Sequence, residues 1–193
     1  ASASNSTEPY LGTRKWPVRS GEGPHALVLG NSINALLLNF KCVTSTTPNE
    51  EMKAVSQKLL EDGIPVWMGC DVGKEMDRKG GYWDANLFNV SELYGVEYGM
   101  DKENRLRHGQ TMMTHAMLFT GVDLEKDKSL KWRVENSWGV KGGDKGYYLM
   151  TDDWFNEYNY EVVIDKKYLP KKLLKLFDKK PVQLAPWDPM GAL

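Results

Sequence analysis

The clearest hydrophobic pattern in the chain follows Pro48 and has the period of an α-helix. Apolar residues recur at helical spacing from Asn49 to Asp62, and Gly63 stands where a C-terminal cap belongs. The next run, I-P-V-W-M-G-C-D-V at 64–72, is apolar and rich in β-forming residues. The pattern therefore predicts one amphipathic helix followed by a buried strand.

Two further strands are predicted at 114–122 and 131–138, with the charged stretch E-K-D-K as the loop between them. Side chains alternate between the two faces of a strand. One face of the second strand carries Trp132, Val134, Asn136 and Trp138. Asn136 is thus a polar residue on an apolar face, and a buried amide without a partner costs on the order of 1–3 kcal/mol. The fold must supply a hydrogen-bond partner for it.

The predicted hairpin offers His115 as that partner. If the strands pair antiparallel about residue 126, His115 comes within one position of Asn136 and shares its face. The amide oxygen could then orient the imidazole and leave its second nitrogen free, as a general base for a thiol or hydroxyl requires. The alternative is a satisfied, half-buried histidine beside a turn asparagine. For an isolated histidine and asparagine this alternative is favoured; the register and the adjacent tryptophan, taken together with the resemblance described below, favour a functional pair.

The rest of the chain carries weaker signals, each with a structural interpretation. Residues 74–107 are expected to form a long, partly ordered segment with a short helix. The glycines at 141–146 indicate a loop. Asp152 and Asp153 are expected to begin a short helix rather than to bind a metal. A lysine-rich helix is predicted at 169–177, with a solvated face as the favoured interpretation and a subunit contact or a nucleic-acid surface as alternatives.

Composition narrows the class of protein. The chain has 193 residues, a formal charge of -1 and two cysteines. This charge gives no net attraction to nucleic acid or to an anionic membrane. Cys42 and Cys70 form neither a disulfide framework nor a zinc site and suggest a reducing, cytoplasmic location. The apolar stretch 26–40 is too short to span a membrane and lies too far along the chain for a signal peptide. No metal or other cofactor is indicated.

Four segments together resemble the C-terminal part of the bleomycin hydrolase family of papain-like cysteine aminopeptidases. They are T-H-A-M (114–117), R-V-E-N-S-W-G (133–139), G-Y-Y-L-M-T (146–151) and W-D-P-M-G-A-L (187–193). The resemblance runs from about Pro48 to the end, which leaves residues 1–47 unassigned and expected to be poorly ordered or foreign to the family. It implies an α+β fold: a papain-like, β-rich C-terminal subdomain at 48–193 with an antiparallel twisted sheet, flanking helices and an extended C-terminal arm.

The resemblance also implies roles for particular residues. His115 matches the catalytic histidine, Asn136 the residue that orients it, and Trp138 the indole that shields their hydrogen bond from water. The arm at 185–193 would lie in the active-site cleft, with Ala192 and Leu193 anchoring the N-terminus of the substrate. The implied partners are peptides with a free N-terminus and further copies of the chain in a homohexamer.

The family's nucleophile is not found in the sequence. It should lie on a helix in a Gly-x-Cys-Trp context, and neither Cys42 nor Cys70 has that context. Cys70 is expected to be a small apolar filler, because no helix begins after it to lower its pKa. The chain alone is therefore expected to be inactive. It would be part of a longer enzyme, the product of a faulty gene prediction, or a noncatalytic assembly or binding module.

Overall fold

The computed structural model describes residues 11–13, 26–30, 43–45, 48–97 and 99–175, with side chains from Pro48 onward. The strands are β1 (Leu11–Thr13), β2 (Ala26–Gly30), β3 (Val43–Ser45), β4 (Val66–Cys70), β5 (Met76–Asp77), β6 (Tyr82–Trp83), β7 (His115–Glu125), β8 (Lys128–Glu135), β9 (Tyr147–Thr151) and β10 (Asn159–Asp165). The helices are α1 (Asn49–Glu61), α2 (Val90–Tyr94), α3 (Lys102–Arg107), α4 (Asp152–Tyr158), the 3-10 helix η1 (Lys166–Tyr168) and α5 (Lys171–Leu174).

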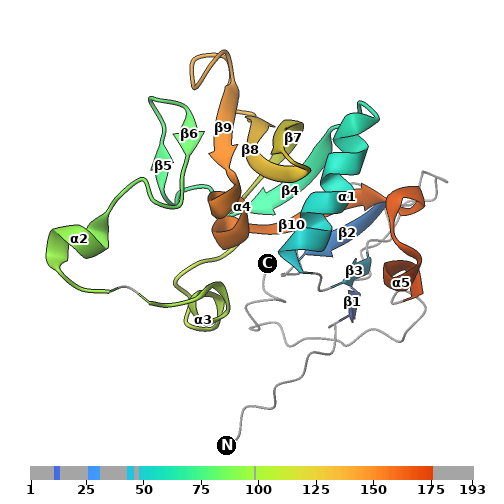
Figure 1. Ribbon diagram of the computed structural model, residues 1–193, viewed down its shortest axis with the longest axis horizontal. Helices are drawn as coiled ribbons and strands as arrows, with labels where there is room; N and C mark the ends of the chain where they lie inside the picture. Colours follow the sequence, from blue (N-terminus) through green and yellow to red (C-terminus); the bar gives the residue numbers. More distant parts are fainter. Residues whose placement is uncertain (1–10, 14–25, 31–42, 46–47, 98, 176–193) are drawn as a thin grey trace, which may run out of the picture.

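The strands of the described part of the chain form one sheet in the order β1-β3-β2-β10-β4-β7-β8-β9-β6-β5. Most neighbouring strands pair antiparallel, and the exceptions in this sheet are β2 with β3 and β6 with β9. Helix α1 packs against β4, β7 and β10, while α4 contacts β8, β9 and β10 (Figure 1). The fold is therefore α+β, with helices flanking a mainly antiparallel sheet, as the sequence predicted.

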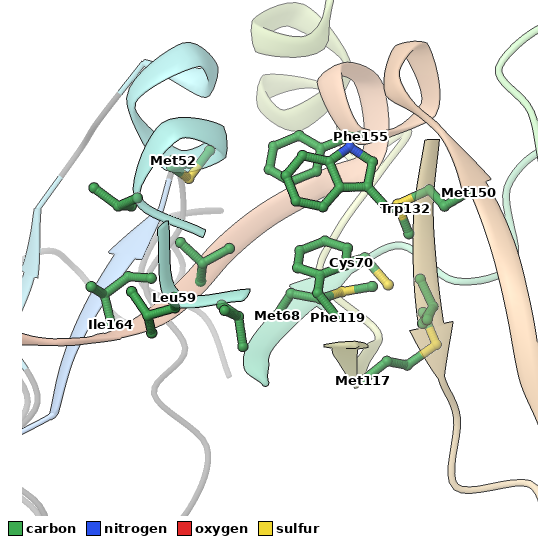
Figure 2. Close-up of a cluster of buried hydrophobic side chains, with 14 of the residues drawn as sticks. Met52, Leu59, Met68, Cys70, Met117, Phe119, Trp132, Met150, Phe155 and Ile164 are labelled. Atoms are coloured by element: carbon green, nitrogen blue, oxygen red, sulfur yellow. The ribbon is translucent and has the colours of Figure 1, made fainter. Parts of the chain in front are cut away.

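The core lies between α1, α4 and the sheet. Helix α1 contributes Met52, Val55 and Leu59, which recur at helical spacing and are buried. Phe119, Trp132 and Phe155 pack together, with ring centroids 4.9–5.5 Å apart, and Figure 2 shows them beside the methionines and Leu59. Each such side chain contributes about 1.5–3 kcal/mol through burial.

A buried ion pair connects α1 to the start of α4. The ammonium group of Lys53 donates to the Asp152 carboxylate across 2.6 Å, and only 8% of the lysine side chain is exposed. The other carboxylate oxygen of Asp152 accepts from the Trp132 indole at 3.1 Å and from the Ser129 hydroxyl. Thr151 caps the helix by accepting from the backbone of Trp154. Asp152 begins α4 as predicted, and it also holds a lysine that the sequence pattern did not single out.

Strands β7 and β8 form a hairpin closed by two residues. Lys126 and Asp127 both have positive φ, at 50° and 65°. Two such residues match the type I′ turn, whose twist suits a tight antiparallel hairpin. The turn is shorter than the predicted four-residue loop, and both strands continue to it. Leu118 faces Glu135 and Phe119 faces Val134 at the other end of the ladder.

The remaining predicted elements are found close to their expected positions. The helix predicted at 49–62 is α1, and the strand predicted at 64–72 is β4. The excursion at 74–107 contains two short strands and two short helices, with α2 standing away from the sheet (Figure 1). The lysine-rich helix is α5, which is shorter than predicted: Leu169 is extended, Pro170 and Lys175 cap the helix, and residues 176–177 lie outside the described residues. Among the helices described, none is both long and apolar enough to cross a membrane.

Candidate active site

The candidate pair lies where the apolar, core-facing rows of β7 and β8 reach the end of the hairpin. Met117 and Phe119 on β7 and Val134 on β8 are each at most 2% exposed. His115 is the next residue of the β7 row and is half-buried. Asn136 follows Val134 in the same alternation, one residue beyond the end of β8, and is 8% exposed. The two polar side chains therefore continue the core at its solvent boundary.

The imidazole of His115 is bonded to the side chain of Asn136. Its Nε2 lies 2.9 Å from the Asn136 Oδ1, which also accepts from the backbone N–H of Ser137 at 2.8 Å. A backbone N–H can only donate, so this second contact fixes the oxygen end of the amide. Nε2 must therefore carry the proton that it shares with Asn136. Nδ1 is left as the nitrogen able to accept a proton.

The register of the hairpin corrects one detail of the sequence interpretation. Continuing the pairing of Leu118 with Glu135 places Asn136 opposite Met117, not opposite His115. The His115 contact is thus a diagonal one across the ladder, over a separation that long side chains can span. The prediction that both residues project from one face is confirmed, because a shift of two positions keeps the face.

Asn136 is held by its backbone as well as by its side chain. Its N–H donates to the carbonyl of Gly146 at 3.1 Å, in the loop that follows the hairpin. The amide nitrogen Nδ2 is buried and has no hydrogen-bond partner among the described residues. Leaving a buried donor unpaired costs about 1–3 kcal/mol.

Trp138 covers the imidazole. Its indole stacks on the His115 ring with centroids 5.2 Å apart and planes at 27°, and the Tyr148 ring meets the indole edge-on at 6.1 Å. The indole is 37% exposed. It therefore contacts the imidazole while keeping an accessible surface. The guanidinium carbon of Arg78 lies over the Trp138 ring, 4.7 Å from its centroid. No sequence pattern indicated this contact between distant segments.

A buried carboxylate secures the segment just before His115. Asp71 is 5% exposed and accepts from the hydroxyls of Thr111 and Thr114, at 2.8 and 3.3 Å, and from the backbone of Met112. Thr111 is bonded in turn to the Tyr160 hydroxyl at 2.6 Å. The sequence interpretation missed this network. Its only local signal is a carboxylate placed directly after a strand of apolar residues.

Cys70 has the environment of a filler and not of a nucleophile. It pairs with His115 in the β4–β7 ladder, but its side chain is 0% exposed within the apolar cluster. Burial raises the pKa of the thiol well above its ordinary value, and the Asp71 charge raises it further. The thiol is therefore protonated at neutral pH, where only a thiolate would be reactive. Figure 2 places Cys70 among apolar side chains.

The other candidate residues from the sequence analysis contribute nothing to this site in the part of the chain that the structure describes. Cys42, Ala192, Leu193 and the arm at 185–193 lie outside the described residues. Within the described ranges, no group of three or more histidine, cysteine or acidic side chains has the arrangement to hold a metal ion. His108 is exposed at the C-terminal cap of α3.

Comparisons with known proteins identify the family. A sequence model of the Peptidase C1-like family matches residues 29–191, a range that begins inside the segment 1–47. Bleomycin hydrolase of Gallus gallus is 48% identical over 157 residues, which cover 79% of this chain and 34% of that protein. Aminopeptidase C of Lactobacillus helveticus is 46% identical over 147 residues, covering 75% and 33%.

A solved structure supports the same assignment at the level of the fold. The crystal structure of PepW from Lactobacillus rhamnosis matches with a TM-score of 0.75 and 38% identity, over 97% of this chain and 42% of that one. The chain spans about a third of the length of the curated relatives that it matches. With a matching family model, close relatives and a common α+β fold, this chain belongs to the Peptidase C1-like family of papain-like cysteine peptidases, alongside bleomycin hydrolases and aminopeptidases C.

Proposed function

We propose that this chain supplies the proton-transfer half of a cysteine aminopeptidase. The observation that carries the proposal is the hydrogen bond from His115 to Asn136, which engages Nε2 and leaves Nδ1 as the nitrogen available for proton transfer. Cysteine, histidine and asparagine form one of the recurring arrangements for nucleophilic attack on a peptide carbonyl. Membership of a family of cysteine peptidases supports reading the pair in this way.

His115 would act twice in the reaction. Its Nδ1 first takes the proton of a cysteine thiol, and the thiolate sulfur attacks the carbonyl carbon of the scissile bond. The imidazolium then returns the proton to the departing nitrogen as the carbon–nitrogen bond breaks, leaving a thioester. A water molecule, deprotonated by the same nitrogen, hydrolyses the thioester. Asn136 keeps Nδ1 aimed at the reacting atoms throughout, because it holds the opposite nitrogen of the ring.

Trp138 would protect the hydrogen bond on which this orientation depends. Its indole lies over the imidazole and restricts the approach of water from that side. Hydrogen bonds are electrostatically stronger where water is excluded. We expect replacement of Trp138 by alanine to leave the pair formed but loosened.

The nucleophile would come from outside the described residues. The buried, protonated thiol of Cys70 argues against that residue, and Cys42 lacks the family's sequence context. We propose further that the arm at 185–193, through Ala192 and Leu193, receives the substrate's N-terminal ammonium and so selects peptides with a free N-terminus. A homohexameric assembly in the cytoplasm is the expected setting by family resemblance.

Reconstitution with a nucleophile-bearing segment tests the proposal. The part of Lactobacillus helveticus aminopeptidase C that this chain does not match would be co-expressed with the chain, and co-purification would establish assembly. The assembled pair should hydrolyse an aminoacyl anilide but not its N-acetylated form, and His115→Ala should abolish the activity. The chain alone should show no turnover.

Two results would contradict the proposal. An assembled complex that neither turns over substrate nor reacts with a thiol-directed active-site probe would favour a noncatalytic assembly module. Turnover that survives His115→Ala would place the general base elsewhere.

A further inference from the structure

The guanidinium of Arg78 packs on the indole of Trp138 and has no role in the proposed reaction. The Arg78 guanidinium carbon lies 4.7 Å from the indole centroid, on an exposed side chain in the turn between β5 and β6. No hydrogen bond or ion pair joins Arg78 to any of the residues that the structure describes. A guanidinium held by a ring face keeps its N–H donors free for an oxyanion.

Arg78 and three exposed lysines lie on two loops that contact each other. The turn carrying Arg78 contacts the loop that follows Trp138, since a Cβ added at Gly81 would lie 2.6 Å from the Gly143 Cα. The Leu149 N–H donates to the Gly81 carbonyl at 3.0 Å and holds the turn in place. We call the exposed cations of these two loops the basic rim: Arg78, Lys79, Lys141 and Lys145.

The carboxylates of these loops do not neutralise the basic rim. Asp77 uses its Oδ1 to accept from the backbone of Lys79 and Gly80, at 2.9 and 2.7 Å, and so stabilises the turn. Asp144 is exposed in the other loop. Two carboxylates against four cations leave these two loops with a net positive charge.

The position of the basic rim relates it to one side of the proposed reaction. A histidine that protonates the departing nitrogen must lie beside the leaving segment of the substrate. Trp138 covers His115, and Arg78 lies on Trp138, so the two contacts place the guanidinium no more than about 10 Å from the imidazole. An extended peptide covers that distance in about three residues, at roughly 3.3–3.6 Å each.

We propose that Arg78, supported by the other cations of the basic rim, forms a subsite that binds a carboxylate of the substrate within the first three residues of the leaving segment. An acidic side chain there, or the C-terminal carboxylate of a short peptide, would lie over the exposed part of Trp138 and meet the free guanidinium donors. The inference rests on the proposed function, because the role of His115 defines the leaving side.

Binding to the chain itself tests this subsite without requiring turnover. The probes are two blocked peptides that differ only in charge, acetyl-Ala-Glu-Glu-amide and acetyl-Ala-Gln-Gln-amide. Titration would follow the indole N–H signal of Trp138 by ¹⁵N NMR, assigned with Trp138→Phe. The acidic peptide should bind about two- to fivefold more tightly, the range for exposed ion pairs, and added salt should reduce the difference.

Variants identify the responsible cation. Arg78→Gln should remove the preference for the acidic peptide, and Arg78→Lys should retain part of it because the charge remains. Arg107→Gln is the matched control, since Arg107 is an exposed arginine on α3 paired with Glu103. It should leave the preference unchanged.

Several outcomes would overturn the proposal. These are equal binding of the two peptides, no shift of the Trp138 signal at millimolar peptide, and a preference that survives Arg78→Gln. A single-stranded oligonucleotide that shifts the same signal at lower concentration than the acidic peptide would point instead to a nucleic-acid surface. Failure of the peptidase reconstitution would leave these binding results intact, so the two proposals can fail separately.

Discussion

His115 and Asn136 are bonded diagonally across the end of a hairpin, with the imidazole Nε2 donating to the amide oxygen over 2.9 Å. The same oxygen accepts from the Ser137 backbone, which leaves the amide a single orientation. The hydrogen-bonding capacity of one asparagine therefore determines which nitrogen of the histidine is free.

Replacing Asn136 by alanine should keep His115 in place but remove the hydrogen bond that orients its ring. Asn136→Ala should eliminate the slowly exchanging Nε2 proton signal of His115 from the NMR spectrum of the chain, while the fold is retained. In the reconstituted enzyme we expect kcat to fall by about 100-fold, as for other losses of catalytic positioning, with KM little changed. His108→Ala, at an exposed site, serves as the control for both measurements.

The carboxylate of Asp71 should position His115 from a distance. Asp71→Asn replaces one acceptor oxygen by an amide nitrogen that can only donate, so Thr111 or Thr114 loses its present acceptor. We expect the free energy of unfolding to drop by about 1–3 kcal/mol and the His115 ring signals to broaden. Asp123→Asn, an exposed change on β7, should do neither. Unchanged His115 signals in a destabilised Asp71→Asn variant would limit Asp71 to a structural role.

The buried ion pair between Lys53 and Asp152 gives a prediction about stability alone. Asp152→Asn leaves the lysine charge buried, with the exposed Glu50 as its one remaining acidic partner among the residues that the structure describes. The expected loss is about 3 kcal/mol, measured by urea unfolding. The neighbouring Asp153→Asn is the control, because Asp153 is exposed, and its loss should be much smaller. Similar losses for both variants would contradict the assignment.

Lys102 should make stability depend on pH. Its ammonium group donates to the Asn159 carbonyl at 2.6 Å and lies 4.9 Å from the Tyr160 ring. Burial lowers the pKa of Lys102 to about 7, with Glu157 opposing the shift and Arg105 adding to it. Between that value and the ordinary lysine pKa, the unfolded chain binds a proton that the folded chain does not. Stability should therefore rise with pH in this window.

Urea unfolding between about pH 7 and pH 9 measures this contribution, which reaches at most about 1.4 kcal/mol per pH unit. The gain should be present in the parent chain and absent from Lys102→Met. Lys58→Met, an exposed change on α1, should keep it. Equal pH dependence in the parent and in Lys102→Met would show that the ammonium group remains charged in the folded state.

Helices and strands that are marked by short-range sequence patterns could be predicted from the sequence. Helical spacing marked α1, the acidic pair after Thr151 marked α4, and alternation marked the buried face of β8. Alternation predicted that His115 and Asn136 share a face. The predicted pairing of the two strands was off by one position, because the turn is shorter than expected. Lys126 and Asp127, both with positive φ, close the hairpin in two residues. Neither is a glycine, so the sequence gives no clear signal for this turn.

Contacts between distant segments were not predictable in this way. Strand β10 pairs with β2 and β4 in the interior of the sheet, yet no strand was predicted at Asn159–Asp165. The contacts of Asp71 with Thr111 and of Arg78 with Trp138 join segments 40 or more positions apart. Their formation depends on strand order, which hydrophobic periodicity does not encode.

The tight turn at Lys126 and Asp127 also bears on how the site could be transferred between proteins. Only 21 positions separate the histidine from its asparagine, and one hairpin contains both. Closing so short a stretch costs little chain entropy and takes microseconds. A graft of this site onto another antiparallel sheet would still need the hairpin extended to Trp138, together with the Gly146 carbonyl and the Asp71 contacts that hold its two ends.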